Sequence, residues 1–245
     1  LFTVATPGTT NSATPVSVVL YLNEWMAANT EASGIADPAD NHYQDWFEIY
    51  NPGPVPVDLE GWFLSDALIM RWQFQIPAGY AVPARGYLLV WADGEPEQNT
   101  ASRADLHANF RLAQDGEAIA LTNPDGTVVD AVGFGPQTND VSQGRFPDGS
   151  TVIGLLPVPT PGAANGDGFI AWVADTRFTV DRGFYDRPFE VEVTTSTPGA
   201  TIYITTDGSV PTPTNGSRYV GAIEVGRTTI LRAAAYRDGY RPSDV

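Results

Sequence analysis

The stretch Asp45-Trp46-Phe47-Glu48-Ile49-Tyr50, followed by Asn51-Pro52-Gly53-Pro54, decides the fold class of this 245-residue chain. Aromatic and β-branched residues favour a strand, and the proline–glycine run after them cannot continue the pairing. Helical periodicity is nearly missing, and Glu24–Asn29 allows one or two turns at most. The sequence therefore predicts an all-β protein. Comparable strand-like segments recur at Val16–Leu22, Gly86–Trp91, Glu117–Thr122, Thr127–Val132, Phe189–Thr195, Thr201–Thr205, Arg218–Val225 and Thr228–Tyr236.

The composition excludes several classes of function. The chain has 13 basic and 29 acidic residues, for a net charge of −16, and all the basic residues are arginine. Nucleic acids and anionic membrane surfaces attract basic proteins, so we expect neither as a partner. No apolar run is long enough for a membrane helix, which argues against membrane insertion. Cysteine is absent, which excludes disulfides, thiolate nucleophiles and zinc–thiolate sites.

A change of composition divides the chain. The segment Pro157–Gly166 contains prolines that cannot donate to a sheet, and a different series of strands follows it. We therefore expect an extended arm or linker over residues 1–15, a first domain over 16–166, a linker over 167–175 and a second domain over 176–245. The turn Asn123-Pro124-Asp125-Gly126 predicts a β-hairpin within the first domain.

The first domain carries an ordered series of motifs: Leu22-Asn23-Glu24-Trp25-Met26-Ala27, Asp45–Asn51, Val57–Asp66, Ile76–Gly79, Asn123–Asp130 and Pro159–Gly166. In these motifs it resembles the lamin-tail domain in its bacterial extracellular form. This resemblance implies an immunoglobulin-like β-sandwich with an interaction or scaffolding role and no catalysis.

The second domain has its own set of motifs, at Thr197–Ser209, Pro211-Thr212, Tyr219 and Leu231–Ala235. In these residues it resembles the C-terminal module of chitobiase and β-hexosaminidase. The resemblance implies another immunoglobulin-like sandwich, which serves as a non-catalytic appendage of a large secreted bacterial protein. The family pattern continues past Val245 into one more strand, so we expect this domain to lack its last strand within the sequence given.

The sequence offers no convincing catalytic residues, and we expect no enzyme here. His42 lies in an acidic loop and is expected to be solvated, whereas His107 is expected to be a hydrogen-bonded residue under a long loop. Glu24 and Glu48 lie within apolar strands, where a carboxylate needs hydrogen-bonding partners. We expect them to connect adjacent strands or turns.

The loop from Glu31 to Asp45 is a candidate metal site, with Asp37, Asp40 and Asp45 as ligands. Ca²⁺ takes carboxylate and carbonyl oxygens, so it is the only cofactor that the sequence suggests. The alternative is a solvated acidic loop whose aspartates make turns. Asp93, Glu95 and Glu97 form a weaker second candidate.

Two of the six tryptophans, Trp72 and Trp172, are candidate contacts for a polysaccharide, because aromatic rings stack on sugar rings. Packing within the core or between domains is the alternative for both. The other four lie within strand motifs, where a large aromatic residue is normally part of the core.

These features predict a structural or adhesive module of a secreted or cell-surface bacterial protein, which contacts other copies of itself or adjoining domains. The segment Leu1-Phe2-Thr3-Val4-Ala5 is a candidate strand to complete the second domain of a neighbouring copy. Such head-to-tail contacts do not close and would propagate as a filament. The alternatives are that the missing strand follows Val245 in the same polypeptide, and that the chain is a carbohydrate-binding region of a larger secreted enzyme.

Overall fold

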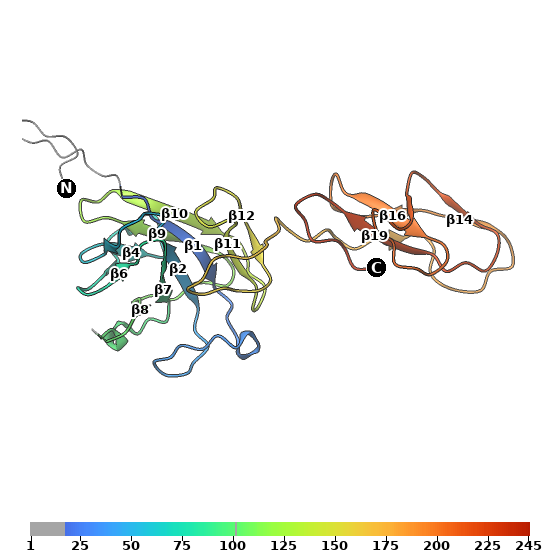
Figure 1. The fold of residues 1–245 in the computed structure, drawn as a ribbon. Helices are drawn as coiled ribbons and strands as arrows, with labels where there is room; N and C mark the ends of the chain where they lie inside the picture. The colour runs from blue at the N-terminus through green and yellow to red at the C-terminus, as the bar shows by residue number, and fades with distance from the viewer. Residues whose placement is uncertain (1–17, 101) are drawn as a thin grey trace, which may run out of the picture. The chain divides into compact units, whose positions relative to one another are not determined.

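The structure, a computed structural model, describes residues 18–100 and 102–245. It divides the chain into two compact units, Leu1–Asp167 and Gly168–Val245. Among the described residues both units consist of short β-strands, with two 3-10 helices in the first (Figure 1). The prediction of an all-β protein is confirmed.

Unit 1 contains two main sheets. The larger has the order β12-β11-β1-β2-β7-β8 and the smaller β10-β9-β4-β5, while β3 and β6 form a separate pair. Neighbouring strands are antiparallel except for β7 and β8, which are parallel. The elements are β1 (Tyr21–Met26), η1 (Glu31–Ser33), β2 (Trp46–Tyr50), β3 (Val57–Asp58), β4 (Phe63–Ser65), β5 (Phe74–Gln75), β6 (Ala81–Val82), β7 (Tyr87–Trp91), η2 (Pro96–Gln98), β8 (Leu106–His107), β9 (Glu117–Thr122), β10 (Val128–Phe134), β11 (Ser142–Arg145) and β12 (Ile153–Leu156).

Alternation along β2 assigns its side chains to two faces. Phe47 and Ile49 lie in the main core together with Leu64 and Leu121 of the smaller sheet, so the two sheets pack face to face. Trp46 and Glu48 therefore point to the opposite side of the larger sheet, here called the outer face. Met26, Trp46 and Trp91 form a second, smaller apolar cluster on that face.

Unit 2 consists of the sheets β13–β15, β14–β18 and β17-β16-β19. Its core is smaller and includes Val173, Val193, Ile202, Ala233 and Ala235. The strands are β13 (Arg177–Phe178), β14 (Phe189–Val191), β15 (Val193–Thr194), β16 (Thr201–Thr205), β17 (Ser217–Arg218), β18 (Ile223–Val225) and β19 (Arg232–Tyr236).

Three expectations need correction or fall outside the structure. Residues 24–29 do not form a helical turn, because β1 continues to Met26 and pairs with β2. Residues 168–175 of the predicted linker belong to unit 2, since Val173 is buried in its core and its N–H donates to the Arg241 carbonyl (2.9 Å). The predicted arm over residues 1–15, with the assembly strand Leu1–Ala5, lies outside the described residues.

Candidate functional site

The outer face of the larger sheet carries two groups of buried polar side chains. Glu24 of β1 lies opposite Glu48 of β2, and two residues further along the sheet Trp46 lies opposite Trp91 of β7. Trp91 in turn lies beside His107 of β8. We call the group around Glu24 and Glu48 the glutamate cluster and the group around His107 the histidine cluster.

The glutamate cluster is satisfied by hydrogen bonds. Glu48 accepts from the Asn23 side chain at 2.9 Å and from the Gly162 N–H at 2.8 Å. Glu24 accepts from the Ser142 hydroxyl and from both the N–H and the hydroxyl of Thr160. The expectation that the two glutamates connect strands and turns is confirmed. Thr160 and Gly162 lie in the proline-rich segment, which therefore folds back onto the outer face.

Burial is the main cause of the raised pKa values of these two glutamates. Removal from water raises the pKa of Glu48 to about 8, even though the hydrogen bonds from Asn23 and Gly162 favour the ionised form. Burial also raises the pKa of Glu24 against the effect of its hydroxyl and N–H donors. Every carboxylate oxygen of this cluster has a donor, so the cluster is a structural connection between the sheet and the segment that covers it.

Three separate segments supply the histidine cluster. Asp37 comes from the loop between η1 and β2, Asp93 lies two residues after the end of β7, and His107 ends β8. All three side chains are fully buried. The Asn99 side chain fixes the backbone of His107, because it accepts from the His107 N–H at 2.8 Å and donates to the His107 carbonyl at 2.7 Å.

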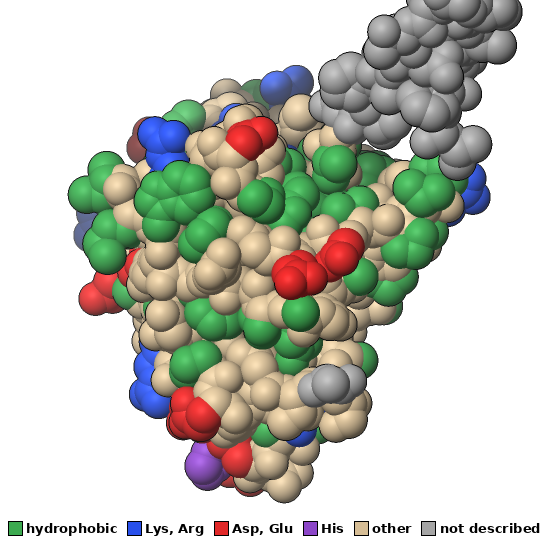
Figure 2. All heavy atoms as spheres, turned by 90° about the vertical axis from the view of Figure 1, so that its left-hand side faces the viewer, with side chains coloured by type: hydrophobic (Ala, Val, Ile, Leu, Met, Phe, Trp, Pro, Cys, Tyr) green, Lys and Arg blue, Asp and Glu red, His purple; other side chains and the backbone are tan. Residues whose placement is uncertain are grey.

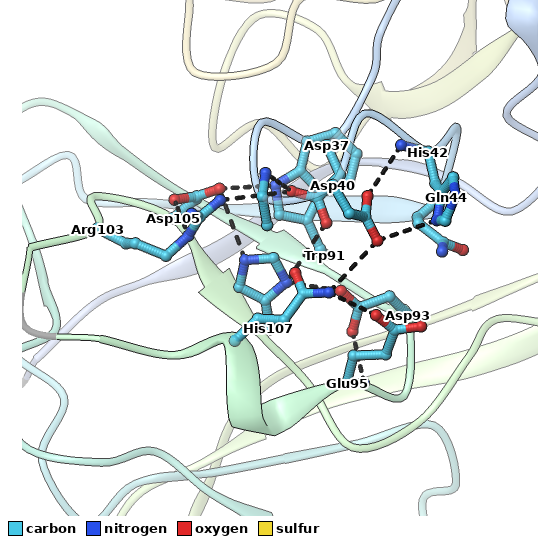
Figure 3. A network of polar contacts seen from close by, with 12 residues as sticks. Asp37, Asp40, His42, Gln44, Trp91, Asp93, Glu95, Arg103, Asp105 and His107 are labelled. Atoms are coloured by element: carbon cyan, nitrogen blue, oxygen red, sulfur yellow. Dashed lines mark hydrogen bonds and ion pairs between the residues drawn. The ribbon is translucent and has the colours of Figure 1, made fainter.

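Carboxylates surround the imidazole ring (Figure 3). His107 Nδ1 lies 2.6 Å from Asp93 Oδ2 and 3.6 Å from Asp37 Oδ2. Its Nε2 faces Asp105 Oδ2 at 3.8 Å, and that same oxygen accepts from the Trp91 indole N–H at 2.9 Å. The expectation that His107 is a hydrogen-bonded residue under a loop is confirmed.

The carboxylates also determine the charge of the cluster. Burial by itself lowers the pKa of His107, but the hydrogen bond to Asp93 and the charges of Asp93, Asp37 and Asp105 outweigh it and raise that pKa. Burial raises the pKa of Asp37 as well. Arg103 lies 3.6 Å from Asp37 Oδ1 and 3.4 Å from Asp105 Oδ1.

Some polar atoms of the histidine cluster lack hydrogen-bond partners. Asp37 Oδ2, His107 Nε2 and the Arg103 Nε and Nη2 atoms are buried and have no partner within hydrogen-bond geometry among the described residues. Asp37 Oδ1, by contrast, accepts from the Ala39 N–H at 2.7 Å. Orphaned buried atoms are uncommon and require an explanation, such as a bound ion.

The residues predicted to bind Ca²⁺ do not come together. Asp37 is buried beside His107, whereas Asp40 contacts the ring of His42 at 3.0 Å and Gln98 at 3.3 Å. Asp45 accepts from the Asn29 N–H at 3.2 Å, and burial raises its pKa to about 6. The alternative of a solvated acidic loop fits His42, whose side chain is 69% exposed. It does not fit Asp37, whose side chain is fully buried.

The weaker candidate set of Asp93, Glu95 and Glu97 is also split. Asp93 is buried in the histidine cluster, whereas Glu95 accepts from Gln98 and Glu97 lies in the short helix η2. Among the described residues, the three side chains with ligand atoms close enough to hold a metal ion are Asp37, Asp93 and His107.

Trp72 and Trp172 are the two tryptophans at the surface. Their exposed fractions are 55% and 39%, whereas the other four are buried. Trp72 packs edge-on against Phe63, with ring centroids 4.7 Å apart, and Trp172 packs in the same way against Phe169 at 4.9 Å. Packing against a phenylalanine therefore accounts for part of each tryptophan ring, and the rest of the ring is exposed.

The sequence comparisons agree with the resemblances drawn from the motifs. A family model described as Lamin Tail Domain matches residues 14–136, and one described as Chitobiase/beta-hexosaminidase C-terminal domain matches residues 180–245. No curated protein matches the chain. Both matched domains are non-catalytic immunoglobulin-like modules of the kind found in structural or carbohydrate-associated proteins. No helix among the described residues is long and apolar enough to cross a membrane.

Proposed function

Because the chain belongs to the lamin tail domain family, we propose that it is a structural and adhesive segment of a secreted or cell-surface protein. Its partners are other copies of itself or adjoining domains of the same polypeptide. The observation that carries this proposal is an exposed apolar loop between β4 and β5. We call it the apolar loop and define it by Leu68, Ile69, Met70 and Trp72, which are 52%, 93%, 55% and 55% exposed.

Neighbouring elements hold the tryptophan of the apolar loop. Trp72 packs against Phe63 of β4, and the turn between β9 and β10 lies against its ring, since a Cβ on Gly126 would lie 3.0 Å from Trp72 Cζ2. Hydrophobic side chains gather on the upper half of the face shown in Figure 2. A large ring that is already held in place loses little conformational entropy on association, which favours a role of Trp72 in binding.

The chemistry of the apolar loop favours a protein partner. Three aliphatic side chains accompany one tryptophan, and Arg71 lies between Met70 and Trp72. Trp, Met and Arg are enriched at protein interfaces. An arginine within an apolar surface also suits an acidic partner, and this chain itself carries a net charge of −16.

Sedimentation equilibrium over a range of protein and salt concentrations tests the proposal. We expect self-association that improves with moderate salt, because the net negative charge repels copies at low ionic strength. Ile69→Ser and Trp72→Ala should weaken association at least tenfold. Val220→Ser is the matched control, because Val220 is 91% exposed in unit 2. A monomer at all concentrations, or equal weakening by the control, would overturn this function.

The second candidate function is carbohydrate binding, which the exposed rings of Trp72 and Trp172 favour. A glycan array with the full chain measures it directly. Binding that disappears in Trp72→Ala or Trp172→Ala, without self-association of the parent chain, would assign the chain to a larger secreted enzyme as its carbohydrate-binding region.

Filament formation by strand donation is a more specific form of the first proposal. Its support is that β18 pairs only with β14 and β13 only with β15 among the described residues, which leaves sheet edges for a further strand. Deletion of Leu1–Thr6 should then abolish assembly. Assembly that persists after the deletion would exclude strand donation and leave contact through the apolar loop.

A further inference from the structure

We propose that Asp37, Asp93 and His107 form a binding site for a divalent transition-metal ion of the Zn²⁺ type. This site is independent of the proposed function and differs from the Ca²⁺ site expected for Asp37, Asp40 and Asp45. Its ligands are one imidazole nitrogen and two carboxylate oxygens.

The positions of the ligand atoms fit such an ion. His107 Nδ1 and one oxygen from each aspartate lie within 4.8 Å of one another. In a tetrahedral zinc site with bonds near 2.0–2.2 Å, neighbouring ligand atoms are about 3.3 Å apart. The distances from His107 Nδ1 to Asp93 (2.6 Å) and to Asp37 (3.6 Å) lie on either side of that value. Shifts of less than an ångström relative to Nδ1 would therefore bring each carboxylate oxygen to that distance from the imidazole nitrogen.

The orphaned oxygen of Asp37 is an independent indication of a ligand. Asp37 has no exposed side-chain surface, and its Oδ2 atom has no hydrogen-bond partner among the described residues although it is directed at His107. Its other oxygen is engaged by Ala39, which holds the carboxylate in place. In the glutamate cluster, by contrast, every carboxylate oxygen has a donor, so the orphaned oxygen distinguishes Asp37 from the two buried glutamates of this face.

The second nitrogen of His107 has the surroundings of a metal-bound imidazole. When Nδ1 binds a metal, Nε2 carries the proton and needs an acceptor. Asp105 Oδ2 lies 3.8 Å from Nε2, and Trp91 and Arg103 hold that carboxylate. A small shift of Asp105 or of the ring would complete the carboxylate–histidine–metal arrangement that orients many ligating histidines.

The charge of the cluster also fits a dication. Asp37, Asp93 and Asp105 supply three negative charges and Arg103 supplies one positive charge, which leaves two negative charges when the imidazole is neutral. The nitrogen ligand distinguishes the ion, because Ca²⁺ and Mg²⁺ prefer oxygen donors, whereas imidazole suits Zn²⁺ and its neighbours in the first transition row. A bound ion would join the loop after η1 to the ends of β7 and β8.

The test is a calorimetric titration of the chelator-treated full chain with Zn²⁺, and separately with Ca²⁺. We expect one Zn²⁺ per chain and no comparable Ca²⁺ binding. Asp37→Asn and His107→Gln should each weaken Zn²⁺ binding at least tenfold. Asp40→Asn and His42→Gln are matched controls, because they alter the histidine–aspartate pair of the same loop, outside the three proposed ligands, and should weaken Zn²⁺ binding much less.

A spectroscopic measurement on the unaltered chain covers the case in which His107→Gln fails to fold. The chain has two histidines, so ¹H–¹⁵N spectra of the imidazole rings are simple to assign with His42→Gln. Zn²⁺ should shift the Nδ1 resonance of His107. Absence of Zn²⁺ binding, binding lost only in the His42 or Asp40 variants, or preference for Ca²⁺ would each overturn the proposal.

Discussion

The glutamate cluster and the histidine cluster lie on the same outer face of one sheet, are equally buried, and differ in how their polar atoms are satisfied. Backbone and side-chain donors from the proline-rich segment and the neighbouring strands reach every carboxylate oxygen of Glu24 and Glu48. In the histidine cluster, Asp37 Oδ2 and His107 Nε2 have no hydrogen-bond partner within the part of the chain that the structure describes. A buried carboxylate that is fully bonded connects elements of the fold, whereas one with a free oxygen beside an imidazole can hold an ion.

The largest effect that we predict concerns the glutamate cluster, where the buried Glu48 makes the free energy of unfolding depend on pH. Glu48 has a pKa of about 8 in the folded protein and an ordinary value near 4.5 when unfolded. Between these values the folded state binds more protons, so the free energy of unfolding falls as pH rises from 4.5 to 8 and then levels off. Asp45, with a pKa of about 6, acts in the same direction up to that pH.

Each pKa unit corresponds to about 1.4 kcal/mol, so the shift of Glu48 sets an upper limit of about 5 kcal/mol for the loss. Urea unfolding at a series of pH values measures it. Glu48→Gln should remove most of the slope, and Asp40→Asn is the control that should keep it. A free energy of unfolding that rises between pH 5 and pH 8 would contradict the raised pKa of Glu48.

Asn23→Ala tests the hydrogen bonds of the glutamate cluster. Asn23 is fully buried, donates to Glu48 and Asp148, and accepts from the Gly149 N–H. Its removal leaves the Gly149 N–H and one Glu48 oxygen without partners, at a cost of about 1–3 kcal/mol for each group. We therefore expect a loss of about 2–5 kcal/mol in the free energy of unfolding. A loss below 1 kcal/mol would mean that water replaces the side chain.

Much of this architecture could be predicted from the sequence, because local patterns determine it. The expected strand Glu117–Thr122 matches β9, and Thr201–Thr205 matches β16. The need of Glu24 and Glu48 for partners followed from the cost of burying a charge. Their donors did not, because Thr160 and Gly162 belong to a segment whose prolines suggested only a linker.

The histidine cluster could not be predicted, because it depends on pairing between distant segments. The parallel pairing of β7 with β8 places His107 beside Trp91, so that Asp93, two residues later, reaches the imidazole ring. Asp37 was considered as a metal ligand from the sequence and does belong to the cluster, but its neighbours in sequence, Asp40 and Asp45, point elsewhere from the same loop. A signal available in the sequence was that Asp93 lies two residues after a strongly apolar strand.

A smaller effect is expected for Thr160→Val, which removes one of several donors to Glu24. The Thr160 hydroxyl donates to Glu24 Oε2 at 2.8 Å, and the backbone N–H, which the variant keeps, lies 3.2 Å from the same oxygen. We expect a loss of about 1 kcal/mol, measured by urea unfolding. No measurable loss would show that the backbone contact alone satisfies the carboxylate.

The smallest effect on stability is expected for Asp37→Asn in metal-free protein. The amide keeps an oxygen to accept from the Ala39 N–H and removes a negative charge that lies close to Asp93, while the orphaned Oδ2 atom has no hydrogen bond to lose. The change should therefore be within about 1 kcal/mol of zero, although Asp37 is as buried as Asn23. With saturating Zn²⁺ the same variant should be clearly less stable than the parent chain, because only the parent gains stability from the bound ion. Thermal unfolding with and without Zn²⁺ measures both quantities. If Asp37→Asn destabilises the metal-free protein as much as Asn23→Ala does, the carboxylate serves the fold directly and the distinction between the two clusters fails.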